Sequence, residues 1–562
     1  MKRILWFLVL SFWLLVSLTF AQEDTLEFNI DASAKTTALS KIFSPGIDLS
    51  GRGYHREMSW PYNIAAKEVL EKWQNEISFK GIFRLYWNIW EMEQVKLDEP
   101  LKKALFSNYE NIIKNISDSG GIVILSLFGT PPGMGEALDK RSAPLNIKQW
   151  KSLVKNTMRY FSCDKKYHIW YEVWSAPDTE DFFLGTKRDY LNLYQAVAEA
   201  ARELKKEKKI NIFVGGPSVT WWFQNFDGNS IVTAEQSLIY ELIKFCSKRR
   251  LPLDFMSWHA YSTDPQAEKE ATTYNKTLSR LIRDWLKYFR LDQNIPLIID
   301  EWNFDTGLNM AEERGEESFI AASFIPARLK NMSEAGIDYQ LYFSLEDFQD
   351  NELGINANRG AFSYEPKSLD YSSKAKAIYN AFLMLNSLGE KLFSTDISDE
   401  FVGALATKRK EDLVLLIWNY VDPLLARNYI SRNIALLSEK CRVDLLGLFK
   451  SGQLDKVLQG EISLEGLTLT DKLKALLKKA IELNQKAQFF KDKSRNIKIN
   501  LSNIKGNYLY QRYSINGSCA FDCPFSPLEE KEISIDQVYQ ETLALSPYSI
   551  ELIILKVKPS QN

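Results

Sequence analysis

The sequence predicts an α/β fold in which a (β/α)8 TIM barrel is followed by a β-sandwich accessory domain with a helical insert. Three observations support this prediction. Short apolar runs alternate with helix-periodic segments between about residues 82 and 343, which indicates parallel strands joined by right-handed helical crossovers. Beyond about residue 392 the sequence becomes rich in β-forming stretches, which favours an antiparallel sandwich. The length of 562 residues is that of two or three domains.

Eight short apolar runs are the expected strands of the barrel. They lie near residues 43–47, 82–85, 122–127, 169–173, 210–214, 254–257, 297–300 and 339–343. The clearest helix between them has apolar residues at the i, i+3, i+4 spacing, namely Tyr190, Leu193, Tyr194, Val197, Ala201 and Leu204. A count of eight fits a closed barrel. An open doubly wound sheet is the alternative, although no glycine-rich phosphate loop follows a strand.

The accessory domain is expected to contain strands near residues 412–421, 496–501, 508–515 and 549–557. A helical insert interrupts it at about residues 428–493, and the clearest helix of the insert begins with a cap at Thr470 and Asp471. We expect residues 22–42 to supply an N-terminal strand that joins the sandwich. The predicted domains are a barrel over residues 43–392 and a sandwich over residues 393–562.

The N-terminus has the pattern of a secretory signal. A Met-Lys-Arg start precedes an apolar run over residues 4–20, and Ala21 follows it. We therefore expect a signal peptide over residues 1–21 and a secreted or extracytoplasmic protein, located in the periplasm or at the cell surface. Because the apolar run is long, an uncleaved membrane anchor is the alternative.

The chain has 5 cysteines, an odd number. Cys519 and Cys523 are close in sequence and could pair in an oxidising compartment. The remaining three, Cys163, Cys246 and Cys441, are expected to be buried free thiols.

Charge and composition exclude several classes of partner. The formal net charge of −2 gives no basic field for nucleic acid. No Cys/His cluster has the spacing of a metal site, so neither a metal nor an organic cofactor is expected. The 15 Trp and 25 Tyr include candidate platforms for sugar rings, although most such residues belong to cores. We expect a carbohydrate partner.

Candidate site residues follow the expected barrel strands, because the active site of such a barrel lies at their carboxyl ends. Glu301 is the strongest candidate, either as a nucleophile toward an anomeric carbon or as a structural ion-pair partner. Arg84 would hold Glu301 ionised, or form a structural ion pair. Asp300 is expected to face away from the site, because neighbours on a strand alternate. The expected substrate-binding residues are Arg84, Trp87, Trp174, Ser175, His259, Tyr261 and Trp302.

Several segments, in this order, resemble glycoside hydrolase family 39, the group of β-xylosidases and α-L-iduronidases. They are FRLYW, GGIVILSLFGTPPGM, YEVWSAPD, VGGPSV, DFMSWHAYS, PLIIDEWN and YFSLEDF, followed by pieces of the expected sandwich. The resemblance covers most of the mature chain except the insert. It implies a retaining mechanism with Glu301 as the nucleophile. It places the acid/base at position 176, which is Ala176, and a sugar-binding Asn at position 175, which is Ser175.

Alanine has no proton to give, and general acid–base help is worth about 10²–10⁴ in rate. Three hypotheses remain open. A carboxyl elsewhere replaces the missing one: Asp178 or Glu180 first, with Asp181, Glu91, Glu93 and Glu346 as further candidates. The substrate carries a good leaving group or its own acid. The barrel binds a glycan without cleaving it, as a pseudoenzyme. We expect an exported glycoside hydrolase-like protein that acts on a polysaccharide or oligosaccharide, with the pseudoenzyme as the alternative.

Overall fold

The computed structural model describes residues 25–558, except for residues 52–58, 62, 95–98, 223–233, 270–275, 305–317, 351–354, 358–359, 364, 368–369, 396, 398 and 520. The expected signal peptide over residues 1–21 therefore lies outside the described residues.

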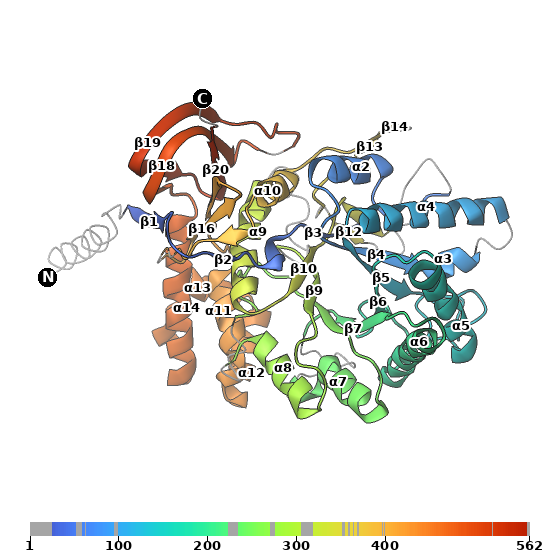
Figure 1. Ribbon diagram of the computed structural model, residues 1–562. Helices are drawn as coiled ribbons and strands as arrows, with labels where there is room; N and C mark the ends of the chain where they lie inside the picture. Colours follow the sequence, from blue (N-terminus) through green and yellow to red (C-terminus); the bar gives the residue numbers. More distant parts are fainter. Residues whose placement is uncertain are drawn as a thin grey trace.

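Eight parallel strands form the closed barrel that the sequence predicts (Figure 1). Each strand pairs with the next one along the chain, and β10 closes the ring on β3. The strands are β3 (Gly46–Asp48), β4 (Ile82–Asn88), β5 (Ile122–Phe128), β6 (Ile169–Val173), β7 (Phe213–Val219), β8 (Phe255–His259), β9 (Leu297–Trp302) and β10 (Tyr339–Tyr342). An open doubly wound sheet is thereby excluded. Strand β7 (Phe213–Val219) begins and ends later than the predicted 210–214, because Gly-Gly-Pro, a composition typical of a turn, lies within the strand here.

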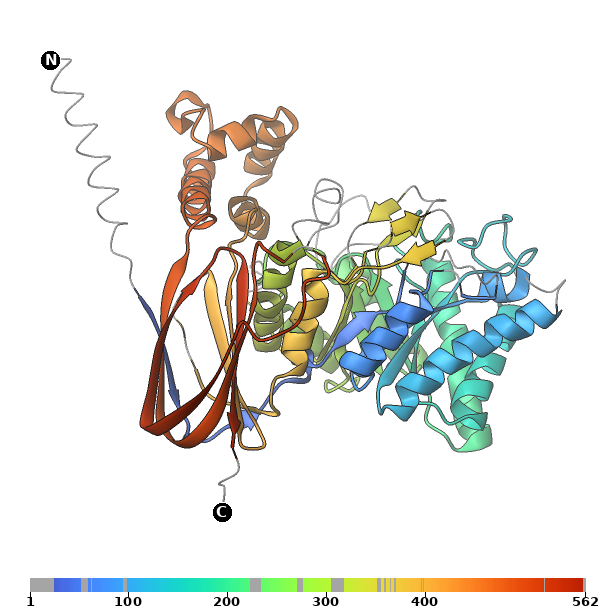
Figure 2. The same cartoon turned by 90° about the horizontal axis from the view of Figure 1, so that it is seen from above.

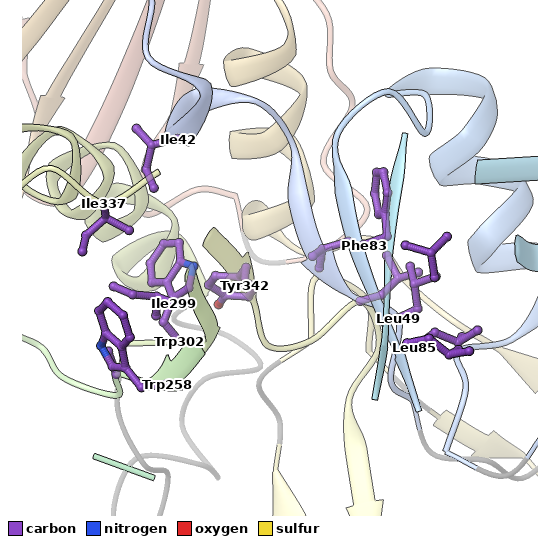
Figure 3. Packing of buried hydrophobic residues seen from close by; sticks show 14 of the residues in the cluster. Ile42, Leu49, Phe83, Leu85, Trp258, Ile299, Trp302, Ile337 and Tyr342 are labelled. Atoms are coloured by element: carbon purple, nitrogen blue, oxygen red, sulfur yellow. The ribbon is translucent and has the colours of Figure 1, made fainter. Parts of the chain in front are cut away.

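Helices surround this ring and bury their apolar faces against it. Helix α6 buries all six residues of its predicted stripe, and a capping box formed by Thr186 and Asp189 begins it. The helices are α2 (Lys67–Glu76), α3 (Ile89–Gln94), α4 (Glu99–Asp118), α5 (Ile147–Met158), α6 (Lys187–Lys208), α7 (Leu238–Arg249), α8 (Leu278–Tyr288), α9 (Ser318–Glu334) and α10 (Ala377–Asn386). Figure 3 shows part of the large apolar core between strands and helices, including Ile299, Trp302 and Tyr342.

Side chains inside the barrel form two layers of different character. The amino-terminal layer is an apolar cluster made of Ile82, Ile124, Trp170, Phe255, Ile298 and Leu341. Two residues further along five of these strands the side chains become polar: Arg84, Ser126, Glu172, Ser257 and Asp300, all fully buried. Because side chains two apart on a strand share a face, the apolar layer closes the barrel from below and the polar layer begins the site above it.

The accessory domain is one eight-stranded, mostly antiparallel sheet that curls over its own core (Figure 2). Its long strand β18 pairs with β19 along most of its length, while β1 and β20 pair with its earlier and later parts, respectively. β1 lies parallel to β18, with Phe28 opposite Ile499. The strands are β1 (Leu26–Asp31), β2 (Thr37–Ala38), β15 (Lys391–Leu392), β16 (Val402–Arg409), β17 (Asp412–Asn419), β18 (Arg495–Ile515), β19 (Glu529–Leu545) and β20 (Ser549–Val557).

Four helices form the insert, and they bury a small apolar core of their own. They are α11 (Leu425–Asn433), α12 (Glu439–Lys450), α13 (Gln453–Leu458) and α14 (Asp471–Phe490). Thr470 accepts from the Leu473 amide and caps α14, as predicted. Figure 2 shows the insert rising from the sheet on the side where two short hairpins follow β10. These hairpins are β11 (Phe348–Asp350) with β12 (Ile355–Ala357), and β13 (Glu365–Lys367) with β14 (Asp370–Ser372).

The insert contacts the barrel through the loop after β8. Asn428 of α11 donates to Thr263 Oγ1 at 2.9 Å, and Arg432 Nε lies 3.4 Å from Asp264 Oδ2. Tyr420, at the end of β17, donates to the Thr263 carbonyl oxygen. These contacts connect the accessory domain to the loop that begins just after His259.

Cys519 and Cys523 form a disulfide, and the other three cysteines are free and buried. Within the described residues no group of His, Cys, Asp and Glu is arranged to hold a metal ion. No helix of the described chain has the length and apolar character needed to cross a membrane.

Candidate active site

Arg84 is the centre of the polar layer at the carboxyl ends of the barrel strands. Its Nε donates to Glu172 Oε2 at 2.7 Å. Its Nη1 donates both to Glu301 Oε1, at 2.5 Å, and to Asp48 Oδ2, at 3.1 Å. The side chain of Arg84 is fully buried. One cation is thus shared by three carboxyl groups from β3, β6 and β9.

Glu301 is held by donors from three sides. Oε1 accepts from Tyr86 at 2.9 Å as well as from Arg84, and Oε2 accepts from Tyr261 at 3.0 Å. His259 Nε2 lies 3.5 Å from Oε1. Burial by itself raises the pKa of Glu301, but the Arg84 guanidinium and the hydrogen bonds from Tyr86 and Arg84 outweigh it and hold that pKa below its usual value. Glu301 is therefore an ionised carboxylate at neutral pH, and its residual exposure of 6% leaves it at the end of the buried layer.

A bulge in β9 corrects the expectation that Asp300 faces away from the site. Trp258 of β8 pairs with Ile299, but the next residue, His259, pairs with Glu301. The extra residue breaks the alternation of the strand. Asp300 keeps the inward direction of Ile298, and Glu301 turns inward as well.

Asp300 lies 4.0 Å from Arg84 Nη2 and 3.9 Å from His259 Nε2. Burial raises its pKa, and the negative charge of Glu172 raises it further. Both effects shift Asp300 toward its protonated form, which would limit the negative charge around the single Arg84. Burial also lowers the pKa of His259, so its imidazole is neutral at neutral pH.

Asp48 is a member of the site that the sequence did not reveal. Its Oδ1 accepts from the Ser50 amide at 2.8 Å while Oδ2 accepts from Arg84. Burial raises the pKa of Asp48 to about 6, despite the nearby guanidinium. The expected strand ended at residue 47, one position before Asp48, and so the side chain was not counted among the strand ends.

The loop after β6 brings Ser175 and Ala176 to this cluster. Ser175 Oγ lies 2.9 Å from Arg84 Nη2 and 3.0 Å from the Tyr86 hydroxyl. Ala176 is buried, has a left-handed φ of 44°, and donates its amide to the Ser218 carbonyl oxygen at 2.8 Å. The backbone conformation is thus fixed at a position that bears only a methyl group.

Asp178 and Glu180 were the expected substitutes for the acid/base, but neither is bound to the cluster around Glu301. Both oxygens of Asp178 accept from Thr220, from its amide at 3.1 and 3.3 Å and from its hydroxyl at 2.5 Å. Burial raises the pKa of Asp178. Glu180 is exposed, and its carbonyl oxygen accepts from Arg141. Asp178 therefore holds the loop after β7, and Glu180 faces outward.

The remaining candidate carboxyls also have partners of their own. Glu91 accepts from the Tyr109 hydroxyl at 3.3 Å. Glu93 lies 3.7 Å from Lys102, and Glu346 accepts from the Ala66 amide at 3.2 Å. Asp181 is exposed on the same loop as Glu180.

The three tryptophans expected to bind substrate differ from the prediction, because their rings are part of the core. Trp302 is fully buried and donates to Gln340, and Trp174 is fully buried and donates to the Phe182 carbonyl oxygen. Trp87 packs against aromatic rings, namely Phe106, Tyr109 and Phe161. None of these three indoles offers an open face to a sugar. Of the expected set, the structure brings Arg84, Ser175, His259 and Tyr261 to Glu301.

A profile described as "Glycosyl hydrolases family 39" matches residues 138–453, which is more than half of the chain and spans β6 to β9 of the site. The chain belongs to glycosyl hydrolase family 39.

Family 39 membership agrees with two curated relatives. A β-xylosidase from Caldicellulosiruptor saccharolyticus is 23% identical over 381 residues, which cover 64% of this chain and 72% of that protein. A β-xylosidase from Geobacillus stearothermophilus is 26% identical over 306 residues, covering 50% of this chain and 53% of that protein. The match thus spans only about half the length of the second relative.

Solved structures share the fold of this family 39 chain. A glucosidase from Croceicoccus marinus superposes with a TM-score of 0.64 at 15% identity, covering 96% of this chain and 100% of that one. A monomeric β-xylosidase from Caulobacter crescentus CB15 gives a TM-score of 0.61 at 13% identity, covering 95% of this chain and 100% of that one. These likenesses show that the barrel and the accessory sheet occur together in other proteins.

Sequence reasoning missed four residues of the cluster: Asp48, Tyr86, Glu172 and Ser218. For two of them a signal existed. Tyr86 follows Arg84 by two positions and so shares its face. Glu172 is a charged residue inside an apolar strand, where a buried charge requires a partner. No comparable signal marks Ser218, whose segment has the composition of a turn.

Proposed function

We propose that this chain is a retaining glycosidase-type enzyme in which Glu301 attacks the anomeric carbon of a sugar. The observation that carries the proposal is the surroundings of Glu301: an ionised carboxylate at the barrel mouth, held by Arg84, Tyr86 and Tyr261. Fixed donors of this kind hold the carboxylate in one orientation and need no reorganisation during the reaction. Xylosides are the first substrates to test, since both curated relatives are named β-xylosidases.

The first step forms a glycosyl ester on Glu301 and expels the leaving group. Arg84 and the two tyrosines fix the carboxylate before the attack, and the neutral His259 adds a further polar contact at 3.5 Å. The position that the family resemblance gives to the acid/base is Ala176, so the leaving group receives no proton from this residue. We infer an enzyme with altered requirements for its leaving group, and we propose that it is exported by the segment over residues 1–21.

A glycan-binding pseudoenzyme is the second candidate, and Ala176 is the observation that favours it. Without an acid, cleavage of an ordinary glycosidic bond loses about 10²–10⁴ in rate. The same barrel mouth, with its tyrosine hydroxyls and Glu301, would then bind a sugar without cleaving it. The two candidates differ in one respect that can be measured, namely whether Glu301 forms a covalent bond.

Covalent trapping distinguishes the candidates. The mature protein is incubated with 2-deoxy-2-fluoro xyloside and glucoside donors that carry 2,4-dinitrophenolate, a leaving group that needs little protonation, and is then weighed intact. We expect an adduct of one fluoro-sugar that maps to Glu301. Glu301→Gln has nearly the same shape and should form none. A folded wild-type protein that gives no adduct with either donor would support the pseudoenzyme.

A further inference from the structure

The backbone at Ala176 is fixed beside the nucleophile cluster. The amide of Ala176 donates to the Ser218 carbonyl oxygen at 2.8 Å, and the preceding Ser175 is bound to Arg84 at 2.9 Å. Ser218 is in turn held by Arg84, at 3.2 Å. Hydrogen bonds on both sides therefore hold residue 176 in place. The side chain presented there is a methyl group, 1% exposed, which carries neither a proton nor a charge.

The carboxyl groups around Glu301 are not placed to supply that proton. Asp48, Glu172 and Asp300 are fully buried in the layer around Arg84 and cannot touch a leaving group. Asp178 is occupied at both oxygens by Thr220. The site thus combines a complete nucleophile with an alanine at position 176, and its four nearby carboxyl groups, Asp48, Glu172, Asp300 and Asp178, are buried or bound to other partners.

This combination suits one class of chemistry. A leaving group that is stable as an anion departs without a proton, and an acceptor that is already an anion attacks without a base. We propose that Glu301 exchanges its glycosyl group between oxyanions of low basicity, of the phosphate or carboxylate class, in place of cleaving an alkyl glycoside with water. The inference rests on the proposed nucleophile and adds the class of donor and acceptor.

Both steps balance without proton transfer. First, a carboxylate oxygen of Glu301 forms a bond to the anomeric carbon, while the bond from that carbon to the leaving oxygen breaks and the oxyanion departs with the electron pair. Second, an oxygen of the acceptor anion forms the new bond to the anomeric carbon, and Glu301 leaves as a carboxylate. Two inversions retain the configuration. A carboxylate at position 176 would repel the incoming anion, and Ala176 removes that repulsion.

The test uses the full mature protein and the dinitrophenyl glycoside of whichever sugar traps Glu301. Release of dinitrophenolate is measured with sodium acetate or inorganic phosphate, against sodium chloride at equal ionic strength. Because water must deglycosylate the enzyme without a base, we expect acetate or phosphate to raise the steady-state rate by roughly 10²-fold. Mass spectrometry and NMR should identify a glycosyl acetate or glycosyl phosphate of retained configuration.

Two variants sharpen the result. Ala176→Glu should lose most of the acceleration by anions and begin to hydrolyse an alkyl glycoside, whereas Ala176→Gln, of the same size but without an acid, should not hydrolyse it. Trapping of Glu301 without any acceleration or transfer product in the wild type would overturn the inference and leave the nucleophile intact. Absence of trapping would instead refute the proposed function. The wild-type measurement decides the question even where a variant fails to fold.

Discussion

Asp48 shares one nitrogen of Arg84 with the nucleophile, and this sharing predicts a pH effect. Asp48 Oδ2 and Glu301 Oε1 lie 3.1 and 2.5 Å from Nη1. Because the pKa of Asp48 is raised to about 6, its negative charge appears as the pH rises through 6, while Glu301 is already ionised. Asp48→Asn replaces the carboxyl by a neutral amide of the same shape. At low pH position 48 is uncharged in both the variant and the wild type, and at high pH only the wild type carries a negative charge there.

The magnitude follows from the geometry. Two carboxylates on one guanidinium nitrogen are roughly 5 Å apart and, at an effective dielectric constant of about 20, repel each other by roughly 3 kcal/mol. Attack on a sugar converts Glu301 into a neutral ester and relieves this repulsion. If about half of this repulsion is relieved in the transition state, the barrier of the attack is lower when Asp48 is ionised, and the attack is about tenfold faster.

The assay is the second-order rate of covalent trapping between pH 4.5 and 8. We expect the wild-type rate to rise about tenfold through pH 6, and the rate of Asp48→Asn to stay flat and to meet the wild type at the acid end. A variant that runs parallel to the wild type at every pH would show that Asp48 contributes only packing. A wild-type rate without a rise near pH 6 would refute the electrostatic reasoning itself.

Three further predictions concern neighbouring features. Asp178→Asn should destabilise the fold by roughly 1.5–3 kcal/mol through weakened bonds to Thr220 and leave the rate of trapping by dinitrophenyl donors unchanged. Turnover of an alkyl glycoside by the wild type that is lost in this variant would instead identify Asp178 as an acid. Trp302→Ala should lower the free energy of unfolding in urea by roughly 3–5 kcal/mol without a change in sugar affinity, and an affinity loss at constant stability would contradict its core position. Burial raises the pKa of Asp422 to about 7 from 3.8, so its contribution to stability is present below about pH 4 and is lost as the pH rises through 7. Asp422→Asn should remove up to roughly 4 kcal/mol of this pH dependence of the unfolding free energy. The measurement is Tm as a function of pH, and identical profiles for variant and wild type would argue against this role of Asp422.

The sequence predicted the fold well because periodicity reports burial directly. Strands with one apolar face and helices with an apolar stripe are local patterns, and the closed barrel follows from counting them. The cap of α14 at Thr470 is local in the same sense. The two small hairpins after β10 lacked such a pattern and were not expected.

The site was predicted less completely, for two physical reasons. A bulge depends on how two strands pair. The sequence of β9 alone therefore does not show that both Asp300 and Glu301 turn inward. The same local sequence allows an aromatic residue at a strand end either to pack in the core or to face a ligand. For Trp87, Trp174 and Trp302, contacts with residues far away in the sequence or in the next loop determine the outcome. Charged residues within apolar strands predicted the site better, because a buried charge requires an oppositely charged or hydrogen-bonding partner.

The path of the chain between the two domains has a consequence for handling the protein. The chain starts in the accessory sheet with β1 and β2, leaves to form the barrel, and returns with β15 to β20. The chain therefore enters the barrel from the accessory sheet and returns to the same sheet when it leaves the barrel. A single protease cut in either connection leaves the fragments attached through β1 and β18, and a truncation after the barrel would strip β1 and β2 of their partners. Shortened versions of this protein should therefore be designed by removing the insert, whose ends both lie in the sheet, and not by dividing barrel from sheet.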